Sequence, residues 1–192
     1  MSKLKVVFYY IKQILLHKKY VFQECKKCGI IWQGITHDLS KFSKEELIPS
    51  AKYYDYYNVE RNDKIIKDYS KAWMHHKGHN PHHWEYWIDY DENGNIVANK
   101  IPYNYVIEMV CDWIGAGKAY EKRWNTDSPF NYYNKVRNGR HFHPETEKLV
   151  LLFLNCIRFH GLKQFHKLAK GEIDNGSVKK KYEGICYQNM EK

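Results

Sequence analysis

The sequence has no uninterrupted apolar run long enough to cross a membrane. Its apolar N-terminal segment carries lysines at positions 3, 5, 12, 18 and 19, whereas a transmembrane helix needs about 20 apolar residues in succession. Nothing near the start resembles a signal peptide. The five cysteines are odd in number and widely scattered, which does not suit a disulfide-stabilised secreted protein. We therefore expect a cytoplasmic protein with free thiols.

Acidic residues are scarce relative to basic ones. The 192-residue chain has 22 acidic and 31 basic residues, for a net charge of +9. This balance favours an anionic ligand or a nucleic-acid surface, and does not choose between them. The length suits one domain over residues 1–192, which can bury a core without disulfides. The lysine-rich end from about residue 172 is expected to be a loosely held tail.

Cys25 and Cys28 have the spacing of half a zinc site. Neither a second CxxC nor a histidine pair at zinc-finger spacing follows. Two free thiols near a helix end are therefore expected, and the sequence leaves their role open.

Apolar residues recur at helical spacing through most of the chain. The expected helices cover residues 3–24, 30–35, 43–57, 63–77, 144–158 and 162–169, with one more from Pro102 through Ile114. Ser43 and Glu46 suggest a capping box. Residues 84–88 and 96–98 flank an Asn-Gly turn and suggest two short strands, and residues 125–142 are interpreted as an irregular, mobile lid. The pattern predicts a single all-α domain of six or seven helices with a small β-hairpin insertion.

The tract Thr36-His37-Asp38-Leu39-Ser40-Lys41-Phe42 places an imidazole, a carboxylate and an ammonium within five consecutive residues. Neighbouring His and Asp side chains near a helix end can both bind one metal ion. Lys41 follows Asp38 by about one helical turn, close enough to hold an anionic substrate group beside that metal. The structural alternative is a polar helix start with Asp38 as the N-cap.

Five of the eleven histidines lie within nine residues, at positions 75, 76, 79, 82 and 83. Gly78 and Pro81 break the helix there, so the imidazoles can converge. The pattern predicts at least one metal ligand, without showing which member of each adjacent pair faces the metal. Asp112 lies on an otherwise hydrophobic helix, where an unpaired charge would cost several kcal/mol. A metal would be a suitable partner for it.

The order of these residues along the chain resembles the HD-domain superfamily of metal-dependent phosphohydrolases. The tract from His37 to Lys41 looks like that superfamily's HD-x-G-K form, with Ser40 in place of the glycine. The resemblance implies an all-helical bundle whose successive helices supply the ligands, and it alone makes His17 a candidate. The implied metal ligands are His17, His37, Asp38, His75, His76, His82, His83 and Asp112. The short gap between the two histidine pairs departs from the superfamily pattern and leaves open whether one or two metals bind.

The segments HDLSKF, HHKGHNPHHWEYW and VCDWIGAGKAY are also similar to an uncharacterised bacterial and phage family, which implies no activity. From the superfamily we expect hydrolysis of a nucleotide or another small phosphorylated metabolite. Asp38 and Lys41 would be catalytic, and one or two divalent ions would serve as cofactor, with Fe, Mn, Mg and Zn all open. Two alternatives remain: a di-iron oxygenase of the same superfamily, and a non-enzymatic basic protein that binds nucleic acid.

Overall fold

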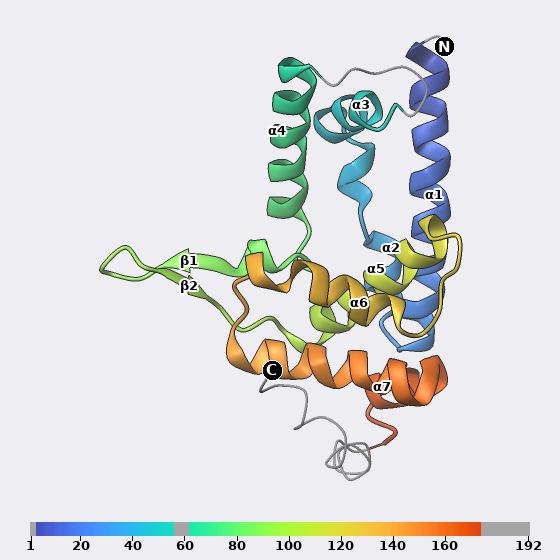
Figure 1. Ribbon diagram of the computed structural model, residues 1–192, viewed down its shortest axis with the longest axis vertical. Coiled ribbons are helices and arrows are strands. Elements are labelled where there is room, and N and C mark those ends of the chain that lie inside the picture. The colour runs from blue at the N-terminus through green and yellow to red at the C-terminus, as the bar shows by residue number, and fades with distance from the viewer. Residues whose placement is uncertain (1–2, 56–61, 174–192) are drawn as a thin grey trace.

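The computed structural model describes residues 3–55 and 62–173 of the chain. Within these residues it contains seven α-helices and one two-stranded antiparallel sheet (Figure 1). The helices are α1 (Lys3–Lys27), α2 (Ile31–Thr36), α3 (Lys44–Tyr53), α4 (Asp63–His79), α5 (Tyr103–Tyr120), α6 (Ser128–Val136) and α7 (Pro144–Ala169). Three short 3-10 helices, η1 (Leu39–Phe42), η2 (Trp84–Trp87) and η3 (Arg137–Gly139), and strands β1 (Ile88–Tyr90) and β2 (Ile96–Ala98) complete the described elements. The expected all-α architecture with a β-hairpin is confirmed.

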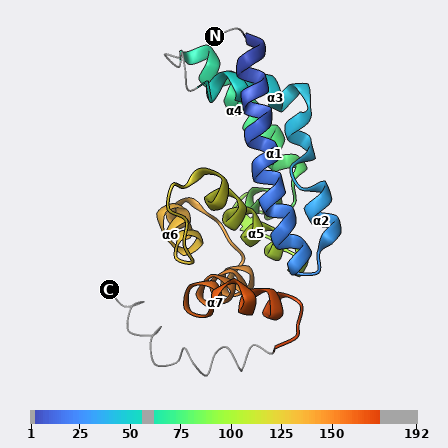
Figure 2. The same ribbon diagram turned by 90° about the vertical axis from the view of Figure 1, so that its right-hand side faces the viewer.

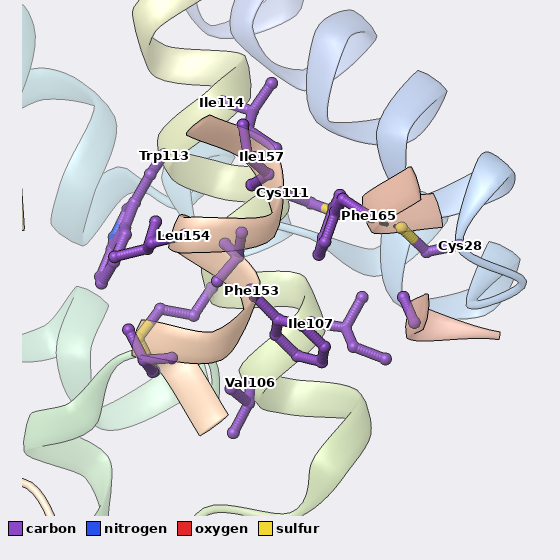
Figure 3. Close-up of a cluster of buried hydrophobic side chains, with 14 of the residues drawn as sticks. Cys28, Val106, Ile107, Cys111, Trp113, Ile114, Phe153, Leu154, Ile157 and Phe165 are labelled. Atoms are coloured by element: carbon purple, nitrogen blue, oxygen red, sulfur yellow. Dashed lines mark hydrogen bonds between the residues drawn. The ribbon is translucent and has the colours of Figure 1, made fainter. Parts of the chain in front are cut away.

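Helix α5 is the centre of the hydrophobic core. It is apolar on most of its surface, with Val106, Ile107 and Ile114 fully buried. Figure 3 shows this helix against α7, where Phe153 and Ile157 supply the facing apolar side chains. A helix that is apolar on nearly every side is typical of the interior of a bundle, whereas a surface helix has one apolar face.

Helix α1 packs closely along α5 because α5 has a glycine at the contact. A Cβ atom at Gly115 would lie 2.4 Å from Cγ2 of Val21, so any larger residue would push the two helices apart. Gly115 lies three residues after Asp112, and Val21 lies four residues after His17. His17 and Asp112 each lie about one helical turn before this contact, so the close packing also brings their side chains together.

The two ends of the molecule are built from different helices. Helices α3 and α4 lie at one end, α7 crosses the other, and α1 runs between them (Figures 1 and 2). The β1–β2 hairpin projects away from the bundle, with Ile88 opposite Ala98 and Tyr90 opposite Ile96. No helix in the described ranges is long and apolar enough to span a membrane.

Three local predictions differ from the structure. Residues 84–87 form η2 rather than a strand, because Trp87 Nε1 donates to the Pro81 carbonyl and holds the segment in a turn. Residues 125–142, expected to be irregular, contain α6 and η3, whose buried Tyr133 packs into the core. Ser43 precedes α3 as expected, but it makes no capping box, since the Glu46 side chain bonds elsewhere. Most of the predicted tail lies outside the described residues.

Candidate metal centre

Four side-chain atoms from α1, α5 and the turn after α2 converge on one point. They are His17 Nε2, His37 Nε2, Asp38 Oδ2 and Asp112 Oδ1. From His17 Nε2 the distances are 3.3 Å to His37, 3.5 Å to Asp38 and 3.0 Å to Asp112. His37 Nε2 lies 3.3 Å from Asp38 Oδ2 and 3.5 Å from Asp112 Oδ1. We call these four residues the first donor set.

These spacings fit a metal ion at the centre of the set. Ligands about 2.1 Å from a metal lie about 3.4 Å apart in a tetrahedron and about 3.0 Å apart at right angles. The distances in the first donor set, 3.0 to 3.5 Å, lie within about 0.1 Å of these values or between them. His17 Nδ1 and both Asp38 carboxylate oxygens are buried and have no well-directed hydrogen bond within the described ranges. Lys41 supplies a positive charge to Asp38 Oδ2, so the oxygen that still calls for a cation is the buried Oδ1.

A second donor set lies on the other side of Asp38. It consists of Asp38 Oδ1 and the Nε2 atoms of His76, His82 and His83. Asp38 Oδ1 is 3.4 Å from His76 Nε2 and 3.6 Å from His82 Nε2, and the His76 and His83 Nε2 atoms are 3.0 Å apart. The Asp38 carboxylate thus directs one oxygen to each set, which is the arrangement of a carboxylate that bridges two metal ions.

The backbone at Asp38 is unusual. Its φ of 55° makes it the one non-glycine residue with a positive φ in the part of the chain that the structure describes. Residues other than glycine rarely adopt this left-handed backbone conformation, which costs of order 1 kcal/mol or more. The reversal separates α2 from η1 and allows His37 and Asp38, although adjacent in sequence, to face the same centre. Asp38 is therefore not an ordinary N-cap, and it makes no capping hydrogen bond.

Two buried glutamates orient the histidines from outside the donor sets. Glu108 Oε1 accepts hydrogen bonds from His37 Nδ1 at 3.0 Å and from His82 Nδ1 at 3.1 Å. Glu46 Oε2 accepts from His76 Nδ1 at 2.8 Å. With Nδ1 held as the donor in each ring, Nε2 is the atom that faces the donor set, and it can bind a metal once it has given up its proton. Carboxylates that hold histidines in this way are typical of metal sites.

The electrostatic environment keeps the site carboxylates ionised. Burial alone would raise the pKa of Asp38, but the neighbouring charges of His37 and Lys41 hold that pKa well below its usual range. Burial also acts to raise the pKa of Asp112, and hydrogen bonds from His17 and His37 lower it well below its ordinary value. Both groups are therefore available as anionic ligands at neutral pH.

The structure gathers seven of the eight predicted ligands and leaves out His75. His75 Nδ1 instead contacts Glu46 Oε1 at 2.7 Å, and its ring stacks on His79. Consecutive residues on a helix point about 100° apart, so only one of His75 and His76 can face the centre. The other pair behaves differently, because His82 and His83 lie in the loop after α4 and both reach the second donor set.

The sequence did not identify the two glutamates. Glu46 had the position of a capping-box residue, a purely structural interpretation. Glu108 lies four residues before Asp112, so the two carboxylates share one face of a hydrophobic helix. That spacing is a signal that points to a shared role.

The four cysteines within the described residues are buried and free, and none belongs to a donor set. Cys25 and Cys28 are buried in the core, and Cys28 Sγ is 3.9 Å from Cys111 Sγ. They belong to none of the metal-type groups found among the described residues. Burial is the main cause that raises the pKa of Cys111, so its thiol stays protonated.

Six of the seven residues of the two donor sets, all except His37, line a cavity of about 480 Å³. Lys41 lies on its wall, with Nζ 2.6 Å from Asp38 Oδ2. Burial alone would lower the Lys41 pKa, but the Asp38 carboxylate raises it, so the amine stays charged. The rest of the wall includes Trp73, Trp84, Glu85, Trp113, Tyr132 and Arg140. A cavity of this size suits a small-molecule ligand.

A family model described as a family of unknown function (DUF5662) matches residues 7–155, more than three quarters of the chain. Every residue of the two donor sets falls inside the match. No curated protein and no solved structure matches the chain. Any proposal about activity therefore rests on the geometry of the candidate metal centre.

Proposed function

We propose that this chain, which belongs to the DUF5662 family, is a metal-dependent phosphohydrolase acting on a nucleotide or another small phosphorylated metabolite. The observation that carries the proposal is the position of Asp38, whose two oxygens each face a separate donor set. Pairs of metal sites joined in this way are common in enzymes that cleave phosphate esters. The ligand order that resembles the HD-domain superfamily is consistent with the same chemistry.

The donor sets would hold one divalent ion each, with Asp38 as the shared ligand. Such ions lower the pKa of bound water and stabilise negative charge on phosphoryl oxygens. Lys41 lies on the same cavity wall and remains charged, so it would hold a phosphate oxygen beside Asp38. On substrate binding its contact to Asp38 is exchanged for one to the phosphate.

Glu85 is the best placed proton acceptor. It lines the cavity beside the second donor set, with Oε2 3.9 Å from His83 Nδ1. This Oε2 atom is buried and has no hydrogen-bond partner in the described part of the chain. Both Asp38 oxygens are directed at the donor sets, so Asp38 itself is poorly placed to take a proton from water. We assign that role to Glu85 and a bridging role to Asp38.

The proposal is tested with protein purified without chelator. Metal analysis should give up to two divalent ions per chain. Loading with Mn, Mg, Fe or Zn should then support hydrolysis of at least one substrate class among nucleoside monophosphates, cyclic dinucleotides and simple phosphomonoesters. Absence of turnover with every metal and every class would rule out this function.

A di-iron oxygenase is the second candidate. The donor sets contain five histidines and two carboxylates, a mixture of nitrogen and oxygen ligands that suits iron. Two irons per chain, together with oxygen consumption on addition of a polyol or phosphonate, would favour oxidation over hydrolysis. Nucleic-acid binding, suggested by the net charge of +9, is a separate hypothesis. It predicts binding that weakens steeply with salt and survives removal of the metal.

A further inference from the structure

A second cavity of about 310 Å³ opens beside the metal centre. Its wall shares Lys41, Tyr54, Trp73, His76 and Tyr120 with the first cavity. The two spaces therefore adjoin, with Lys41 and Trp73 at their boundary. We call the second one the tyrosine compartment.

The walls of the tyrosine compartment are mainly aromatic. Tyr10 comes from α1, Tyr54 from the end of α3, Tyr69 and Trp73 from α4, and Tyr120 from α5. The Tyr10 and Tyr54 rings are nearly parallel, with centroids 5.9 Å apart. Four separate helices thus each direct a ring to one space, and no side chain of residues 3–55 or 62–173 fills that space. A hydrophobic core would be packed instead.

The polar groups of the compartment are almost all uncharged. The Tyr54 and Tyr69 hydroxyls are hydrogen-bonded to each other at 2.8 Å. Burial raises the pKa of Tyr10, Tyr69 and Tyr120, so these hydroxyls stay protonated at any physiological pH. Glu46 also touches the compartment, but its two oxygens are occupied by His75 and His76. Lys41 is the remaining charged group, and it lies at the boundary with the metal centre.

This chemistry fits a flat, uncharged ring. Aromatic walls stack on the faces of a ring, and neutral hydroxyls satisfy polar atoms on its edge. The compartment has room for about ten water molecules. A ring that displaces this water buries its own apolar surface and that of the aromatic walls. If the bound ring itself carried a negative charge, Lys41 would be its one cationic partner among the described residues that line the compartment.

We propose that the tyrosine compartment binds an aromatic or heteroaromatic ring joined to the phosphate that is cleaved. The inference rests on the proposed function for the position of the phosphate, and it narrows the substrate to ring-bearing phosphate esters. Lys41 stands between the two parts, with the phosphate on the side of Asp38 and the ring on the side of Tyr69.

The test compares two substrates with the same carbon skeleton, one with an aromatic ring and one with a saturated ring. Benzyl phosphate and cyclohexylmethyl phosphate have similar leaving groups, so their chemical reactivity is alike. The metal-loaded enzyme should prefer benzyl phosphate by about tenfold or more in kcat/KM, as expected for loss of one stacked ring. Tyr69→Leu, which removes one aromatic wall of the compartment, should bring this ratio close to one.

Two variants separate recognition from folding. Tyr69→Phe keeps the ring and should retain the preference. Tyr90→Leu changes a tyrosine of β1 that is 67% exposed and lines neither cavity, so it should match the wild type. Equal losses for both substrates in Tyr69→Leu, or no ring preference in the wild type, would overturn the compartment while leaving hydrolysis intact.

A binding measurement tests the ring site even if the protein hydrolyses no phosphate ester. Indole, followed by ligand-observed NMR, should bind the metal-loaded wild type and Tyr90→Leu saturably, and should bind Tyr69→Leu at least tenfold more weakly. If no phosphate ester is hydrolysed but this pattern holds, the ring site stands and the phosphohydrolase does not. If indole binds all three proteins equally, or none, the ring site is wrong.

Discussion

Asp112 Oδ1 on α5 lies 3.0 Å from Nε2 of His17 on α1. This contact joins two helices that are far apart in sequence, and it depends on their close packing at Gly115. Asp38 belongs to both donor sets, whereas the Asp112 carboxylate belongs to the first set alone. Asp112 therefore reports on the first set separately from the second.

Changing Asp112 to Asn keeps the size of the side chain and removes its charge. We expect the variant to lose the ion of the first donor set, to keep most of the second, and to have no measurable hydrolysis. Metal analysis after gel filtration measures the first effect directly. Asp127→Asn is a matched control, because Asp127 forms a surface ion pair with Arg158 far from the donor sets. Full metal occupancy in Asp112→Asn would remove this residue from the site.

Glu108 and Glu46 should have distinguishable effects on metal affinity. Glu108 holds His37 of the first set and His82 of the second, whereas Glu46 holds only His76 of the second. Loss of such a supporting carboxylate weakens metal binding by about 10- to 100-fold. Glu108→Gln should therefore weaken both sites and Glu46→Gln only one, as measured by titration against a competing chelator. Identical two-site behaviour in the two variants would contradict the assignment.

Much of the fold was predictable, because long helices repeat their apolar residues at regular spacing. The kink in α7 falls at Gly161, whose φ is 77°, as the glycine in that pattern suggested. Helix α6 was missed, since its two asparagines and its proline resemble a loop. The proline lies in the first turn, where a helix tolerates it.

The clustering of the candidate metal ligands was predictable to the level of residue type and order. Choosing between His75 and His76 needed the orientation of α4, which depends on packing against α3 and not on local sequence. The placement of Asp38 between the two donor sets needed the left-handed backbone at that residue, which the sequence does not signal. The roles of Glu46 and Glu108 depend on contacts 30 and 71 residues away along the chain. Such contacts have no local pattern.

Lys41→Ala tests the anion-binding role of the lysine. If Lys41 holds a phosphate oxygen, kcat/KM should fall by the contribution of a charged hydrogen bond, roughly 1.5 to 3 kcal/mol. Metal content should stay at the wild-type level, because Lys41 is not a ligand. Lys44→Ala, at an exposed lysine in the first turn of α3, is the control for a change of net charge. Unchanged kinetics in Lys41→Ala would show that the lysine serves only to neutralise Asp38.

Glu85→Gln tests the assignment of the proton acceptor. The amide keeps the shape of the side chain but cannot take a proton, so kcat should fall by about 10²-fold or more. KM and metal content should change little, since Glu85 lies 3.9 Å from His83 Nδ1 and makes no direct hydrogen bond to it. Rapid-quench measurement of a single turnover locates the loss in the chemical step. A variant that loses metal instead would make Glu85 a supporting carboxylate like Glu108.

Glu24 provides a prediction about stability that is independent of the metal centre. Its buried carboxylate contacts Lys27 and Lys118 at 2.9 Å through Oε1 and His166 at 2.7 Å through Oε2, which ties α1 to α5 and α7. Burial alone would raise the Glu24 pKa, but hydrogen bonds from His166, Lys27 and Lys118 lower it from 4.5 to about 2.

A folded-state pKa below the unfolded one means that this stabilisation is present above about pH 4.5 and is lost as the pH falls toward 2. Glu24→Gln should therefore lower the free energy of unfolding at pH 7 by about 3 kcal/mol, the low end for a broken buried ion pair, because Lys27 is half exposed and can be solvated. Urea unfolding of metal-free protein at pH 7, 4.5 and 3 measures the effect. The gap between wild type and variant should narrow as the pH falls below 4.5. A gap of constant size would mean that Glu24 stabilises the helix junction by shape and hydrogen bonding, and not through its charge.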